Sequence, residues 1–149
     1  MLMEHCKKSL FVTLALDRIA MVGWLACVPL VPLMARWYDV YSNKEPIFRQ
    51  FVICVYAAMI PAGIIVYLLN SLLSNIKDGV VFDSMNVKCL RIISYCCFAI
   101  AAVSLVMAVW RILAVILVLA FSFMGLLLRV LKNVFEQGVV IREENDLTV

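Results

Sequence analysis

Four long apolar stretches, separated by short polar segments, dominate the pattern of the chain. They cover residues 16–35, 51–73, 92–110 and 112–128. A helix needs roughly 20 mostly apolar residues to cross a hydrocarbon core about 30 Å thick, and these stretches come close to that length. The pattern predicts an all-α membrane protein, a single domain whose four transmembrane helices form two hairpins.

The third and fourth stretches are separated from each other by an argument from helix length. Only Trp110 and Arg111 separate them. One continuous helix from Arg91 to Arg129 would be about 57 Å long at about 1.5 Å per residue, nearly twice the core thickness. Tilting cannot absorb so large an excess. We therefore expect a tight turn at Trp110–Arg111.

Three prolines lie inside the first two stretches, namely Pro29, Pro32 and Pro61. In membrane helices, groups on neighbouring helices can satisfy the carbonyl oxygens that a proline frees. We expect these prolines to bend their helices without ending them.

The distribution of lysine and arginine indicates the orientation. With both termini inside, the cytoplasmic segments hold nine of these residues: Lys7, Lys8, Arg18, Lys77, Lys88, Arg91, Arg129, Lys132 and Arg142. The outer loops hold four: Arg36, Lys44, Arg49 and Arg111. Positive residues gather on the cytoplasmic side of membrane proteins. We expect a multi-pass protein of the bacterial inner membrane with both termini cytoplasmic and residues 129–149 as a cytoplasmic tail.

An internal repeat aligns Gly79-Val80-Val81-Phe82 with Gly138-Val139-Val140-Ile141. Each copy follows an apolar helical stripe, and glycine is the usual residue of a left-handed helix cap. The repeat predicts that both helices stop at these glycines and continue as short extended segments on the cytoplasmic side, paired in a two-stranded ladder. The two hairpins would be related by a pseudo-two-fold axis along the membrane normal. Chance similarity between apolar segments is the alternative.

The composition of the chain argues against an enzyme, a metal site or a nucleic-acid-binding surface. The chain is 66% hydrophobic and only 15% charged, with a scattered net charge of +3, so we expect no nucleic-acid surface. None of the six cysteines forms a Cys-x-x-Cys pair or lies in an outer loop, and His5 is the only histidine. Buried cysteine behaves as a small apolar residue. We expect no catalytic residues, no metal site and no cofactor, hence no enzyme.

Asp17 and Arg18 are the only charges near the interior of a predicted span. Ionisable residues inside a membrane are costly and suggest function. Because this pair lies close to the cytoplasmic boundary, Arg18 can extend to the surface while Asp17 faces the other helices. A structural or topological role is the favoured interpretation.

The C-terminal tail is the best candidate for an interaction site. Lys132 and Glu136 have the spacing of an i, i+4 ion pair on the emerging helix. An acidic segment is repelled by an anionic membrane surface, so it is available to a soluble partner or folds back on the basic segment 77–91. A solvated tail without a partner is the alternative. The candidate partner-binding residues are Gly79, Gly138, Glu143, Glu144, Asn145, Asp146, Leu147, Thr148 and Val149.

The chain thus ends in a glycine and an apolar pair, followed by Glu144-Asn145-Asp146-Leu147-Thr148-Val149. This terminus, placed after four apolar spans, resembles a bacterial family known as domain of unknown function 2975. The resemblance implies a small four-span protein without catalytic residues. It also implies a partner, because genes of the family often stand beside a small helix-turn-helix regulator of the Cro/repressor type.

Two functions follow from these observations. The first is a non-enzymatic membrane partner or regulator of a cytoplasmic helix-turn-helix transcription factor, acting through its cytoplasmic surface. The alternative is a small transporter or export helper that works as a homo-oligomer. Its support is the set of proline-interrupted helices and the small residues at helix-packing spacing, Ala58, Ala62, Ser104 and Ala108.

Overall fold

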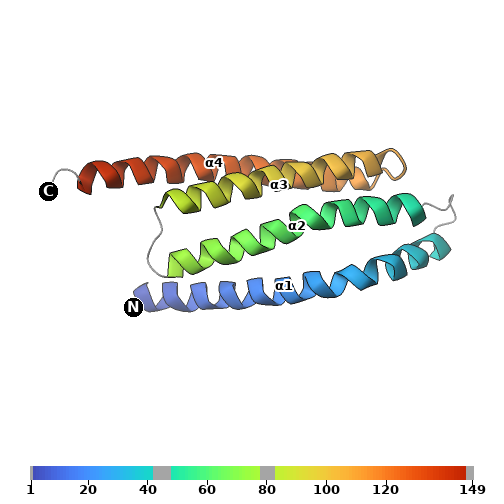
Figure 1. The fold of residues 1–149 in the computed structure, drawn as a ribbon, viewed down its shortest axis with the longest axis horizontal. Coiled ribbons are helices and arrows are strands. Elements are labelled where there is room, and N and C mark those ends of the chain that lie inside the picture. The colour runs from blue at the N-terminus through green and yellow to red at the C-terminus, as the bar shows by residue number, and fades with distance from the viewer. Residues whose placement is uncertain (1, 42–47, 78–82, 147–149) are drawn as a thin grey trace.

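Helices account for nearly all of the described chain. The computed structural model describes residues 2–41, 48–77 and 83–146, with side chains from Val12 to Asn145 within these ranges. The four helices are α1 (Leu2–Tyr41), α2 (Phe48–Lys77), α3 (Ser84–Ala108) and α4 (Ala114–Asp146) (Figure 1). Each is long and apolar enough to cross a membrane, and no strand occurs in the described ranges. The predicted all-α membrane fold with four transmembrane helices is confirmed.

The helices form an open layer in which each contacts its neighbours in the sequence. The α1–α2, α2–α3 and α3–α4 pairs approach within 8 Å between Cα atoms, and no other pair of helices does so in the described ranges. The N- and C-termini lie at the same end of the layer (Figure 1), which we call the terminal end; the other is the turn end. Most of the buried side chains belong to α3, which lies between α2 and α4.

A stripe of side chains at spacings of three, four and seven joins α1 to α2. Such spacing is typical of helices that pack nearly parallel or antiparallel along their length. The buried and half-buried members of this stripe are Leu14, Asp17, Trp24, Val28, Val31, Ala35 and Tyr38.

The prolines leave their helices unbroken, as expected. Pro29 and Pro32 lie inside α1, and Pro61 lies inside α2. Pro32 has no N–H to donate to the carbonyl oxygen of Val28, four residues earlier. The hydroxyl of Tyr56 in α2 donates to that oxygen instead, at 3.0 Å. At this proline the neighbouring helix satisfies the freed carbonyl, which is the compensation the sequence predicts.

At the turn end the chain reverses between Ala108 and Ala114. The N–H of Arg111 donates to the carbonyl of Met107 at 3.0 Å, and the N–H of Ala114 donates to the carbonyl of Arg111 at 2.9 Å. The guanidinium of Arg111 lies 5.4 Å from the centre of the Tyr38 ring, so the turn is also tied to the end of α1. The reversal falls on the predicted Trp110–Arg111 position.

The prediction that α4 stops at Gly138 is wrong. The helix continues through Gly138 to Asp146, so residues 139–141 are helical and cannot form a strand of the expected two-stranded ladder. The stripe that packs α4 on its neighbours keeps its spacing past the glycine: Ala114, Val118, Phe121, Gly125, Leu128, Lys132, Phe135 and Val139. A glycine inside a helix costs only about 1 kcal/mol, which is too little to end it. Gly79 and residues 80–82 lie outside the described residues.

At the terminal end, α1 and α4 extend well beyond their apolar segments. Arg18 and Arg36 bound the apolar part of α1, and Arg111 and Arg129 bound an apolar segment of the same length that ends in α4. A helical segment of roughly 17 residues, as each of these is, spans about 26 Å, close to the hydrocarbon thickness. Beyond Arg129, α4 continues to Asp146 and so adds a segment as long again. This segment, 130–146, is called the α4 extension below.

The contact between Trp24 and Gly63 generates a prediction about the α1–α2 pair. A Cβ atom on Gly63 would lie 2.6 Å from the Trp24 ring, and the ring is held by its Nε1–H, which donates to the carbonyl of Met59 at 3.2 Å. We expect Gly63→Ala to lower the free energy of unfolding by about 1–3 kcal/mol, as overpacking does. Thermal unfolding in detergent measures this. Gly23→Ala is the control, since nothing lies within 4 Å of its added Cβ. Equal melting temperatures for the two variants would contradict the contact.

The α3–α4 pair is joined by a hydrogen bond from the Ser94 hydroxyl to the carbonyl of Gly125, at 2.9 Å. Interhelical hydrogen bonds in membrane proteins contribute about 0.6 kcal/mol on average. We expect Ser94→Ala to cost about that much, and Gly125→Ala to cost more because its Cβ would lie 3.1 Å from the Phe98 ring. Unfolding in mixed detergent micelles provides the measurement, with Ser122→Ala as the control. A larger loss from Ser94→Ala than from Gly125→Ala would reverse the expected order.

Candidate functional site

Polar side chains gather at the terminal end of the layer, in two places. One is a cleft between α1 and α2, and the other is an ion-pair cluster between α3 and α4. They lie near opposite edges of the layer because α1 and α4 are its outer helices.

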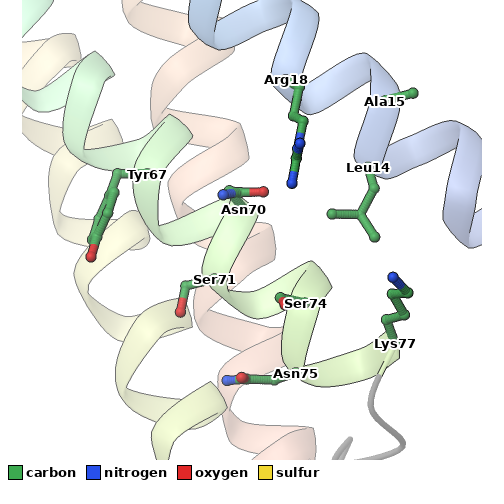
Figure 2. A pocket seen from close by; sticks show the side chains of 9 residues that line it. All are labelled: Leu14, Ala15, Arg18, Tyr67, Asn70, Ser71, Ser74, Asn75 and Lys77. Atoms are coloured by element: carbon green, nitrogen blue, oxygen red, sulfur yellow. The ribbon is translucent and has the colours of Figure 1, made fainter.

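The first place is a cavity of about 530 Å³ that we call the polar cleft (Figure 2). The side chains of Arg18 from α1 and Lys77 from α2 both extend into the same space. Residues of α2 with hydroxyl and amide groups line it as well. The lining residues are Leu14, Ala15, Arg18, Tyr67, Asn70, Ser71, Ser74, Asn75 and Lys77.

Asp17 and Arg18 take different environments, although they are adjacent. Successive helical residues point about 100° apart. Asp17 is only 6% exposed, and its Oδ2 has no hydrogen-bond partner among the described residues. Arg18 is exposed and lines the polar cleft. The pair is therefore split between the interior of the layer and the cleft.

Asn86 joins α2 to α3 beneath the polar cleft, and sequence reasoning assigned it no role. It is fully buried, and its Oδ1 accepts a hydrogen bond from the Nδ2 of Asn75 at 2.9 Å. Its backbone N–H donates to the carbonyl of Asp83 at 3.1 Å, in the first turn of α3. The sequence carried one indication of this role, because an amide inside a largely apolar helix needs a buried partner.

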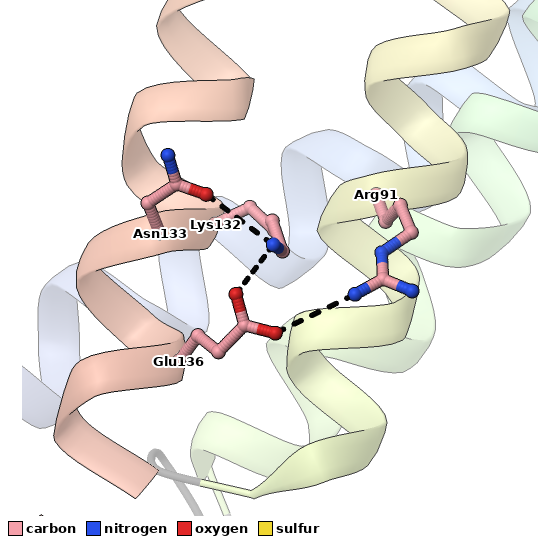
Figure 3. Close-up of polar contacts among 4 residues, drawn as sticks. All are labelled: Arg91, Lys132, Asn133 and Glu136. Carbon is pink, nitrogen blue, oxygen red and sulfur yellow. Dashed lines mark hydrogen bonds and ion pairs between the residues drawn. The ribbon is translucent and has the colours of Figure 1, made fainter. Parts of the chain in front are cut away.

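The second place is an ion-pair cluster around Glu136 (Figure 3). Lys132 Nζ lies 2.5 Å from one carboxylate oxygen of Glu136, and Arg91 Nη2 lies 3.5 Å from the other. The predicted Lys132–Glu136 pair is confirmed, whereas Arg91 is a partner from another helix that spacing could not indicate. Because Glu136 and Arg91 are about half exposed, the cluster orients α3 and α4 more than it stabilises them.

The predicted partner-binding residues lie along the end of α4. Gly138 is half-buried inside the helix, and Glu143, Glu144 and Asn145 are exposed on its last turns. Asp146 is the final helical residue. Leu147, Thr148, Val149 and Gly79 lie outside the described residues. The structure does not bring these residues together with Asp17 and Arg18, since no Cα atom of α1 lies within 8 Å of one in α4 in the described ranges.

Exposed apolar side chains on the α4 extension were not part of the predicted site. They are Val130, Leu131, Val134, Val140 and Ile141. The pattern of the sequence could have indicated them, because the extension follows Arg129 and carries more apolar residues than its packing stripe uses.

The described side chains contain no group of three or more histidine, cysteine, aspartate or glutamate residues placed to hold a metal ion. Cys27, Cys54, Cys89, Cys96 and Cys97 are free thiols, and the last three are buried in α3. Adjacent Cys96 and Cys97 therefore belong to the packed interior of the layer.

Comparisons with known proteins agree with this architecture. An uncharacterized membrane protein of Bacillus subtilis (strain 168), YoaS, is 28% identical over 155 residues, covering 95% of this chain and 97% of its own length. No solved structure matches the chain. The family model described as protein of unknown function (DUF2975) matches residues 17–149. The match extends well beyond the terminal stretch that carries the resemblance, and the chain belongs to the DUF2975 family of membrane proteins.

Proposed function

We propose that this protein is a non-enzymatic membrane partner of a cytoplasmic helix-turn-helix transcription factor, which it holds through the α4 extension. In this proposal both termini face the cytoplasm from the bacterial inner membrane. The observation that supports it most is a row of exposed apolar side chains on the side of α4 that the other helices leave uncovered. Acidic residues follow this row at the end of the helix.

The geometry of the extension supports docking of a protein. Its packing stripe continues through Lys132, Phe135 and Val139. On the opposite side of the helix, at about 100° per residue, lies what we call the outer face: Val130, Val134, Gln137, Ile141 and Glu144. These residues fall at i, i+4, i+7, i+11 and i+14, the arrangement by which a helix inserts its side chains into a groove of a partner.

The exposure of apolar side chains on the outer face supports its role as a binding surface. Val130, Val134 and Ile141 are 61%, 55% and 66% exposed, although they follow the arginine that bounds the apolar segment. A shallow hollow of about 470 Å³, lined in part by Glu136, Gln137 and Ile141, borders this face. Contiguous exposed apolar groups outside lipid are typical of interaction surfaces.

Charge supports a regulator as that occupant. The end of the extension carries Glu143, Glu144 and Asp146 against Arg142. DNA-binding domains have a basic surface that contacts phosphates, and an acidic helix end is complementary to it. Occupation of that basic surface would keep the regulator away from DNA. The resemblance, which implies a neighbouring gene for a helix-turn-helix regulator, points to the same partner.

The transporter or export helper remains the second candidate because of one observation. Asp17 is a buried acidic residue at the edge of the first span, and its Oδ2 lacks a hydrogen-bond partner among the described residues. Such groups often mark ion or substrate paths. Loss of an export or resistance phenotype with Asp17→Asn, while binding of a regulator stays absent, favours this candidate.

The predicted small residues Ala58, Ala62 and Ser104 line a groove of about 330 Å³ over α3 that suits a second copy.

The docking proposal predicts the effect of a charge on the outer face. Val134→Asp places a carboxylate in the centre of the apolar face, so the affinity for the regulator encoded beside the gene should fall at least tenfold. Biolayer interferometry with the full chain in nanodiscs measures this. Met85→Asp is the matched control, because Met85 at the start of α3 is as exposed as Val134, at 55%. The affinity of the Met85→Asp variant for the regulator should remain within threefold of that of the unchanged protein.

A second arm tests the acidic end. Glu144→Lys should slow association and weaken its dependence on salt, as loss of a steering charge does. Point substitutions are preferred to removal of residues 138–149, since that truncation would also shorten α4 inside its packing stripe. Equal affinity of the Val134→Asp and Met85→Asp variants, or no binding by the unchanged protein, would refute docking on the outer face.

A further inference from the structure

We propose that the polar cleft and the apolar groove that continues from it bind one anionic phospholipid from the leaflet at the terminal end. The cleft would hold the phosphate and glycerol of the headgroup, and the groove would hold an acyl chain. This inference concerns α1 and α2, so it stands apart from docking on α4.

The charge of the cleft favours an anion. Arg18 and Lys77 extend into it from opposite helices (Figure 2), and neither forms an ion pair with a carboxylate among the described side chains. Three other cations at this end are already engaged. Arg91 and Lys132 share Glu136, and Arg129 lies 5.6 Å from the centre of the Tyr95 ring. Two cations that form no ion pair among the described side chains therefore line one cavity.

Neutral donors complete the cleft. Ser71 and Ser74 contribute hydroxyls, and Asn70 contributes a side-chain amide, all from α2. These groups donate hydrogen bonds to phosphate or glycerol oxygens. The amide of Asn75 is already used, since it donates to Asn86. The cleft thus offers two charges and three uncharged polar groups to a single phosphodiester.

The depth of the cleft suits a headgroup. Asn70 and Lys77 lie two helical turns apart on α2, or about 10 Å along its axis. The headgroup layer of one leaflet is about 5–8 Å thick, from the difference between the full bilayer and its hydrocarbon core. Asn70 follows the apolar part of α2, and Arg18 bounds the apolar part of α1, so the cleft begins where hydrocarbon ends.

A second cavity favours a lipid over a free phosphate compound. An apolar groove of about 850 Å³ lies between α1 and α2 on the hydrocarbon side, with Ile92 of α3 also lining it. Its walls include Met21, Leu25 and Val28 from α1 and Ile60 and Ile64 from α2. Tyr67 lines both the groove and the polar cleft, so the two cavities meet at its side chain. A ligand that fills both has a charged head and an apolar chain.

Lipid binding to delipidated protein in detergent tests the inference. We expect phosphatidylglycerol to bind about 30-fold more tightly than phosphatidylcholine with the same acyl chains. Each of the two cations contributes about fivefold, the equivalent of about 1 kcal/mol near an anionic headgroup. Glycerol 3-phosphate, which has the head without the chains, should bind far more weakly than either lipid. Native mass spectrometry and lipid-dependent thermal shifts measure these affinities.

Variants locate the site. The double substitution Arg18→Gln with Lys77→Gln should lower the affinity for phosphatidylglycerol about 30-fold and leave that for phosphatidylcholine nearly unchanged. Arg49→Gln, an exposed cation at the turn end, is the control and should change neither. Melting temperatures without added lipid verify that the variants fold.

Three outcomes would overturn the inference. Equal affinity for the two lipids would remove the anion preference. Unchanged affinity of the double variant would place the anion elsewhere. Binding of glycerol 3-phosphate as tight as that of phosphatidylglycerol would assign the cleft to a free phosphate compound.

Discussion

The match between apolar helix length and lipid thickness is the constraint on which the rest of the structure depends. Arg18 and Arg36 bound the apolar part of α1, and an apolar segment of equal length leads from Arg111 to Arg129. About 26 Å of helix suffices to cross the hydrocarbon, so these helices are longer than the crossing requires. Most of the additional length of α1 and α4 lies at the terminal end, with the polar cleft, the Glu136 cluster and the α4 extension. The candidate sites are consequences of helices that are longer than the membrane core they cross.

Packing in an open layer explains why these sites remain accessible. Apart from Tyr38, which packs against the cluster of Met107 and Ala114 at the turn end, each helix packs on its sequence neighbours in the described ranges, so α1 and α4 keep one side uncovered. Close contacts hold the pairs without a closed core: the Trp24 ring lies over Gly63, the Phe98 ring lies against Gly125, and Tyr56 donates to the carbonyl that Pro32 frees. Small residues and interhelical hydrogen bonds serve this purpose in lipid, where apolar burial offers little driving force between helices. A layer held in this way leaves clefts between helices and a free helical face at its edge.

Much of the fold could be predicted from the sequence because it depends on local composition. The four long apolar helices, the turn at Trp110–Arg111 and the unbroken prolines follow from apolar length and from backbone chemistry, and the Lys132–Glu136 pair follows from helical spacing. The glycine at 138 misled the prediction because a cap signal is local, whereas the packing stripe that continues to Val139 is a property of the whole helix. Arg91 as a partner of Glu136, and Asn75 as a partner of Asn86, depend on which helices become neighbours, and spacing along one segment does not contain that information. The polar cleft could not be predicted for the same reason, since its two cations come from different helices and lie far apart in the chain.

Sidedness and depth of the helices are tested most directly by labelling single cysteines with a membrane-impermeant maleimide, in a variant whose native cysteines are replaced by serine or alanine. Cysteine is introduced at Leu119, in the apolar part of α4, and at Val134 and Ile141 on its extension. Val134→Cys and Ile141→Cys should react in inverted vesicles and not in right-side-out vesicles, while Leu119→Cys should react in neither. Reaction of Val134→Cys in right-side-out vesicles, or reaction of Leu119→Cys as fast as that of Ile141→Cys, would contradict it.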